Sequence, residues 1–151
     1  MREDEELKEF IVEAKKNSYA GKNKKIESSR PDSTDYTFKK YDYYYLDSHI
    51  GKQKFIGQEI IWKDSKSIWG MNYIGKLLTN EIPRGFEDFL HAALSKVSID
   101  CPYRGPKSFR QYQFEYQCSW SGGITSFKGE EFISFRGKHI FQLDFNGGTL
   151  S

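Results

Sequence analysis

The sequence has no long hydrophobic run and no marked excess of charge of one sign. Without about 18 consecutive apolar residues, a membrane-spanning helix is not expected. The first residues, MREDEELKEF, are charged and lack an apolar segment, which argues against a secretory signal and favours a cytoplasmic location. The 23 basic and 21 acidic residues are interspersed, so direct nucleic-acid binding is not expected. What remains is a globular chain of 151 residues, which we interpret as a single domain, 1–151.

Cysteine and histidine are too few and too scattered to indicate a metal site or a catalytic nucleophile. Cys101 and Cys118 do not have metal-ligand spacing, and in a reducing compartment they are expected to be free thiols. His49, His91 and His139 share no spacing and lie in polar or helical segments, which is typical of surface histidines. The sequence therefore predicts no metal and no cofactor.

The chain is rich in aromatic residues, at 17%, which favours β-sheet. Apolar residues with helical spacing predict helices over residues 4–16 and 86–97. The polar, lysine-rich stretch from Asn17 to Asp35 is typical of a loop. Six strand-like runs follow the two helices in groups of three, over residues 37–47, 54–62, 67–77, 111–120, 124–135 and 138–145.

An internal similarity relates the two groups of strands. Phe55, Gly57 and Glu59 recur as Phe127, Gly129 and Glu131, at a constant offset of 72 residues. The same offset relates the following further pairs: Tyr44 and Tyr116, Ile61 and Ile133, Trp69 and Phe141, Met71 and Leu143, Tyr73 and Phe145. A Tyr-x-Gly motif also follows each helix, at Tyr19–Gly21 and Tyr103–Gly105. The prediction is an α+β domain built from two pseudo-symmetric repeats, about 4–78 and 84–150. Each repeat would hold one helix and three antiparallel strands, and the two would join in a continuous sheet or a half-open barrel.

The repeated glutamates are the candidate site. Glu59 lies in the apolar strand FIGQEIIW, where burial of a carboxylate is costly unless hydrogen bonds or a cation compensate it. Glu131 holds the equivalent place in FKGEEFISF, and each glutamate follows a glycine that leaves room for a close group. Both could line a cleft and bind a cationic or hydrogen-bonding ligand. Alternatively, each could anchor its own half by accepting hydrogen bonds from a tyrosine hydroxyl or backbone amides.

The segments FIVEAKKNSYAG, FIGQEIIW, IWGMNYIGKL, PYRGP and FKGEEFI, with the closing NGG, resemble a bacterial family of unknown function, domain of unknown function 5680. The resemblance extends over nearly the whole chain. Members often follow a helix-turn-helix DNA-binding domain, so it implies an effector domain of a regulator, here in a stand-alone form. It implies no catalytic residues. The predicted duplication is also similar, by analogy of fold alone, to effector domains that bind organic cations near a buried glutamate.

Three functions follow as hypotheses. The first is a small-molecule-sensing domain, whose candidate ligand-binding residues are Glu59, Glu131, Tyr44, Tyr116, Trp69 and Tyr73. The second is a protein-interaction module, of the kind seen in antitoxins or immunity proteins, that uses an exposed sheet face; open strand edges are also compatible with a homodimer. The third is a small hydrolase or isomerase that uses the glutamate pair as acid and base, and it requires a raised glutamate pKa in a solvent-reached pocket.

Overall fold

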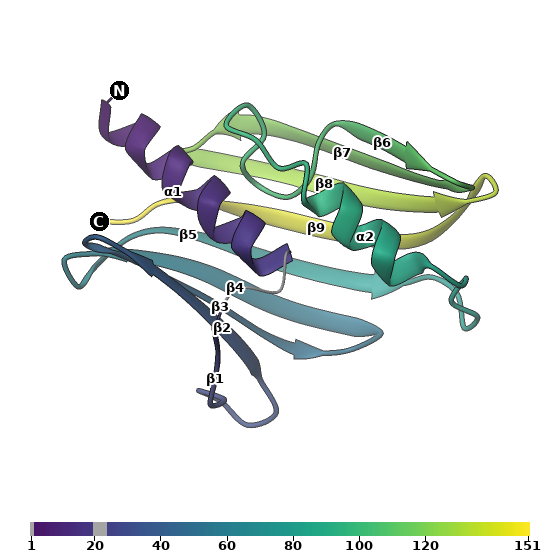
Figure 1. Ribbon diagram of the computed structural model, residues 1–151, viewed down its shortest axis with the longest axis horizontal. Coiled ribbons are helices and arrows are strands. Elements are labelled where there is room, and N and C mark those ends of the chain that lie inside the picture. The colour runs from purple at the N-terminus through teal and green to yellow at the C-terminus, as the bar shows by residue number, and fades with distance from the viewer. Residues whose placement is uncertain (1, 20–23) are drawn as a thin grey trace.

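The computed structural model describes residues 2–19 and 24–151, and in these ranges two helices lie on one face of a nine-stranded antiparallel sheet (Figure 1). The first half of the chain contains α1 (Arg2–Tyr19), β1 (Lys24–Ile26), β2 (Thr34–Lys40), β3 (Tyr43–Gly51), β4 (Lys54–Lys63) and β5 (Lys66–Leu77). The second half contains α2 (Phe86–Leu94), β6 (Ser108–Gln111), β7 (Phe114–Gly123), β8 (Ser126–Phe135) and β9 (Lys138–Thr149).

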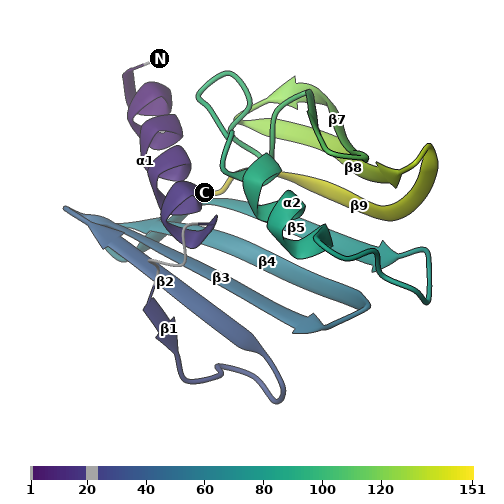
Figure 2. The ribbon, with the colours of Figure 1, turned by 45° about the vertical axis from the view of Figure 1, so that its right-hand side comes forward.

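The strand order is β1-β2-β3-β4-β5-β9-β8-β7-β6. Short hairpins connect β2 through β5 and β6 through β9, so each set forms a meander, and the two meet where β5 pairs antiparallel with β9. The connection from β5 to β6 contains α2 and crosses the same face as α1 (Figure 2). The sheet is therefore continuous, with its long central strands at the join, and it is not a half-open barrel.

The predicted architecture of two repeats with three strands each is wrong. The first half of the chain has α1 and five strands, the second half has α2 and four strands, and all nine strands form a single sheet. The predicted strands 37–47 and 111–120 are each interrupted by a tight turn, at Tyr41 and Tyr112. Both tyrosines have positive φ, 56° and 58°, where glycine or asparagine is usual. The sequence therefore contained no turn signal at these points. β1 lies in the stretch predicted to be a loop.

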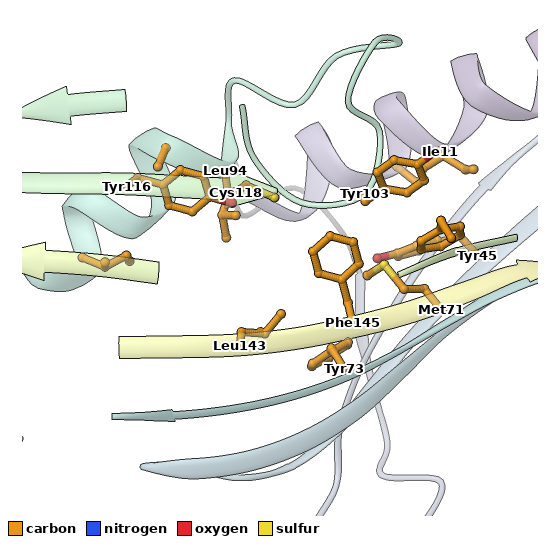
Figure 3. Packing of buried hydrophobic residues seen from close by; sticks show 14 of the residues in the cluster. Ile11, Tyr45, Met71, Tyr73, Leu94, Tyr103, Tyr116, Cys118, Leu143 and Phe145 are labelled. Atoms are coloured by element: carbon orange, nitrogen blue, oxygen red, sulfur yellow. The ribbon is translucent and has the colours of Figure 1, made fainter. Parts of the chain in front are cut away.

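The two helices bury the stripes that their apolar spacing predicts. Leu7, Phe10, Ile11 and Ala14 of α1 are buried, and so are Phe86, Phe89, Ala93 and Leu94 of α2. Figure 3 shows Phe145 rising from β9 toward Tyr103 in the connection after α2, where the ring centres are 6.1 Å apart. Of the motif after the first helix, Gly21 lies outside the described residues. The core is thus the layer between the helices and one face of the sheet, called here the inner face.

Candidate functional site

Glu59 lies on the inner face of β4 and is buried in a network of polar groups. Its carboxylate accepts a hydrogen bond from the Tyr45 hydroxyl on β3 and forms an ion pair with Lys15 of α1, with Nζ and Oε2 2.9 Å apart. Lys15 lies one turn after Ile11 on the buried stripe of α1, so the helix carries its ammonium group into the core. The pKa of Lys15 is lowered by this burial, although the charge of Glu59 acts in the opposite direction.

Glu131 occupies the corresponding position on β8. It accepts a hydrogen bond from the Tyr116 hydroxyl on β7 and a two-pronged interaction from Arg104, with Nε and Nη2 3.1 Å and 2.9 Å from its oxygens. The Tyr116 hydroxyl also accepts a hydrogen bond from the Gly105 amide. Burial, followed by the charge of Glu131, raises the pKa of Tyr116 well above its usual value, so this hydroxyl remains a donor.

The two glutamate networks adjoin each other. Lys15, which pairs with Glu59, also donates to the carbonyl oxygen of Tyr103, and the next residue in the chain is Arg104, which pairs with Glu131. The Arg104 guanidinium lies 5.8 Å from the centre of the Tyr73 ring on β5. The connection after α2 therefore joins both halves of the sheet in one polar cluster, defined by Lys15, Asp47, Glu59, Arg104 and Glu131 together with Tyr45, Tyr73 and Tyr116.

Asp47 is the least compensated member of this cluster. It lies on β3 directly opposite Glu59 and accepts a hydrogen bond of 2.6 Å from the Tyr73 hydroxyl. Burial, followed by the charge of Glu59, raises the pKa of Asp47 from 3.8 to about 7. The cluster formally holds three carboxylates and two cations, and both cations are paired with the glutamates. Near neutral pH, Asp47 can therefore take up or release a proton.

The cluster reaches solvent on one side. Asp47 is half-buried and the Arg104 side chain is 11% exposed, whereas Lys15 and Glu131 are fully buried. Asp47 and Arg104 are thus the partly exposed members of the cluster, and they offer an acceptor and a guanidinium, whereas Tyr73, which contacts both, is buried. Lys15, Glu59 and Glu131 form the closed layer beneath them.

The space beside the two glycines is filled by aromatic rings. A Cβ on Gly57 would lie 2.2 Å from the Tyr73 ring, and one on Gly129 would lie 2.3 Å from the Phe145 ring. Each glycine thus lets an aromatic side chain of the neighbouring strand cross over it. The close-approaching group that the sequence suggested is part of the protein.

Not all the predicted site residues lie in the cluster. Glu59, Glu131, Tyr116 and Tyr73 belong to it. Trp69 is buried on the same face, where its Nε1 donates to the carbonyl oxygen of Ile124 and its ring stacks on Phe127.

Tyr44 points to the opposite face of the sheet, called here the outer face, and packs against Trp62. The tyrosine that reaches Glu59 is its neighbour Tyr45. The constant offset of 72 residues pointed to Tyr44, but the hairpin between β3 and β4 is one residue shorter than the hairpin between β7 and β8. Gly51 pairs with Phe55 in the first, and Gly122 pairs with Phe127 in the second. A one-residue shift in a strand moves a side chain to the other face.

Four members of the cluster were missed from the sequence: Lys15, Tyr45, Asp47 and Arg104. Lys15 could have been found because it occupies an apolar position of the helical stripe. Arg104 lies within the Tyr103-x-Gly105 motif, but only the tertiary structure brings it to Glu131. Asp47 faces inward two residues after Tyr45, as strand alternation requires.

The two cysteines interact with each other in the core, where a side-chain hydrogen bond with Cys118 lowers the pKa of Cys101. Cys101 and Cys118 are free and buried, and the Cys101 thiol donates to the carbonyl oxygen of Gly105 at 2.8 Å. Among the described residues, no group of three or more histidine, cysteine, aspartate or glutamate side chains could hold a metal ion. In the same residues, neither helix is long and apolar enough to cross a membrane.

The fold and the site define a domain in which an open antiparallel sheet and two helices enclose a cluster of buried ion pairs. The family model for the Domain of unknown function (DUF5680) matches residues 47–150, and the chain belongs to this family. The match includes β4 to β9, α2 and the connection that carries Arg104. Comparison with curated proteins gives no match. Comparison with solved structures gives none either.

Proposed function

We propose that the protein binds a small organic ligand with a cationic or hydrogen-bond-donating group, and that Asp47 and Arg104 contact it. The observation that carries the proposal is the surplus carboxylate. Asp47 is half-buried, has a pKa raised to about 7 and faces two cations that are already paired with glutamates. A bound cation would relieve the same unfavourable charge that a proton relieves.

In this proposal the glutamates position the ligand-binding groups. Glu131 holds Arg104 through two hydrogen bonds, and Arg104 lies over the ring of Tyr73. Tyr73 in turn donates to Asp47. A ligand that contacts Asp47 or Arg104 would therefore act on the connection after α2 and on α1, which Lys15 joins to the carbonyl oxygen of Tyr103.

This arrangement suits a sensor. We therefore propose that the protein is an effector domain of a bacterial transcription regulator, and that it works in the cytoplasm with a separate DNA-binding protein. The coupling between the ligand-contacting groups and α1 is what would transmit binding to such a partner.

Thermal unfolding against a panel of amines, quaternary ammonium compounds, nucleotides and metabolites tests the proposal. A ligand at about 100 times its dissociation constant should stabilise the fold by about 2.7 kcal/mol. We expect Asp47→Asn to abolish the shift. The matched control is Glu130→Gln, which removes an exposed carboxylate from the outer face of β8, outside the ligand-contacting groups, and should leave the shift intact.

The pH dependence adds a second criterion. Because a proton competes for the Asp47 carboxylate, binding of a permanently charged ammonium ligand should weaken as the pH falls through about 7. Equal shifts in Asp47→Asn and the wild type, or no shift with any compound, would contradict the proposal.

A further inference from the structure

The outer face of the sheet carries a row of residues whose order is self-complementary. Both helices lie on the inner face, so neither covers this side (Figures 1 and 2). Ile56 of β4 pairs with Ile74 of β5, and their side chains are 56% and 57% exposed. Ile74 pairs in turn with Asp144 of β9. On the other side of Ile56 lies Arg30, held against β3 by a 2.8 Å hydrogen bond from its Nη2 to the Ser48 hydroxyl.

These residues line one shallow hollow of about 290 Å³. Its charge pattern is basic at the β3 side, apolar over β4 and β5, and acidic at β9. A ladder of side-chain amides runs beside it, in which Gln58 donates to Asn72 at 2.8 Å and Asn72 donates to Asn146 at 3.1 Å. Amides both donate and accept, so this ladder can also pair with a copy of itself.

We propose that this face is the interface of a homodimer. A two-fold axis parallel to the strands, between β4 and β5, reverses the strand order of the second copy. It places Ile56 over Ile74 of the second copy and Arg30 over Asp144 of the second copy, and the reverse pairs form by symmetry. Arg30 and Asp144 then each face an opposite charge, and the exposed isoleucines cover each other.

The size of the face sets the expected strength of the dimer. The ten residues of β4 extend about 33 Å, and four strands at about 4.8 Å spacing are about 19 Å wide. The face therefore offers about 600 Å² per subunit, below the roughly 800 Å² of a standard interface. The dimer is accordingly weak and depends on concentration. Lys54 and Lys76, which the same axis brings together, carry like charges and are exposed near the strand ends, so they further limit the strength of the dimer.

Sedimentation velocity over a concentration range of about 100-fold tests the proposal. The wild type should pass from monomer to dimer within this range. Ile74→Lys should weaken association by at least about tenfold. The matched control is Ile99→Lys, which changes an isoleucine that is 42% exposed outside the sheet and should leave association unchanged.

Charge reversal identifies the pairing. Arg30→Asp and Asp144→Arg should each weaken the dimer, and the double variant should restore it, because the opposite charges then face each other again. Thermal unfolding of each variant confirms that it is folded. A wild type that stays monomeric throughout, or a dimer that Ile74→Lys leaves intact, would overturn the proposal, and so would a double variant no better than the two single ones.

Discussion

The most informative perturbation is the replacement of Asp47 by asparagine, which removes the surplus charge and keeps the shape of the side chain. The folded protein raises the pKa of this carboxyl from 3.8 to about 7. Each pKa unit corresponds to about 1.4 kcal/mol, so ionised Asp47 costs the fold up to about 4 kcal/mol. Because Asp47 is only half-buried, water screens part of this, and we expect about 2 kcal/mol.

The sign of the effect depends on pH. Between pH 4 and 7 the folded state keeps the Asp47 proton that the unfolded state has lost, so the contribution of this group to stability falls as the pH rises. Above about 7 the folded state carries the charge and the full cost applies. Asp47→Asn should therefore be more stable than the wild type by about 2 kcal/mol at pH 8, and the difference should decrease to near zero below the unfolded pKa of 3.8.

Urea denaturation of both proteins at several pH values measures this difference directly. Glu130→Gln serves as the control, because its carboxylate is exposed on the outer face of β8 and its replacement should change stability little at any pH. A stability difference that does not vary with pH would refute the reasoning. A wild type that is the more stable protein at pH 8 would do so as well, since it would mean that Lys15 and Arg104 favour ionised Asp47 more than burial disfavours it.

Two further predictions concern the packing around the glutamates. Lys15→Met leaves Glu59 buried without its cation and should cost about 3–5 kcal/mol in urea denaturation, whereas Lys16→Met changes an exposed neighbour and should cost little. Gly129→Ala places a Cβ 2.3 Å from the Phe145 ring and 2.5 Å from the backbone oxygen of Ser119. Thermal unfolding should show a loss of up to about 3 kcal/mol, and an unchanged midpoint would mean that the ring and the strand move aside at little cost.

The local elements of the fold follow from the sequence more closely than its architecture does. The apolar stripes of both helices are buried as their spacing predicts, and Glu59 shares the buried face of β4 with Gly57 and Ile61. The number of strands could not be predicted, because the turn at Tyr41 uses a left-handed tyrosine in place of glycine or asparagine. The inward-facing positions change from even to odd residue numbers across this turn, as the pair Phe38 and Tyr45 shows, but the consecutive tyrosines 43–45 leave no alternation that would reveal the change.

The candidate site was predictable only in part, for a related reason. Burial of a carboxylate in an apolar strand is visible from alternation, so Glu59 and Glu131 could be identified. The position of Lys15 on the apolar stripe marks it as buried, but its pairing with Glu59, like that of Arg104 with Glu131, arises only through tertiary packing. Tyr44 was predicted in place of Tyr45 because the β3–β4 and β7–β8 hairpins differ in length by one residue, which moves the equivalent position to the other face.

The charge balance of the cluster distinguishes its structural members from the member that can respond to a ligand. A network that serves only to hold the helices on the sheet is most stable when every buried charge has a partner. Lys15 with Glu59, and Arg104 with Glu131, meet this condition. Asp47 adds a third carboxylate opposite Glu59. Its ionised form is unfavourable there, as its pKa of about 7 reflects. A change at Asp47 can therefore alter the charge of the cluster near neutral pH while both ion pairs remain in place, which is the property that the proposed binding site requires.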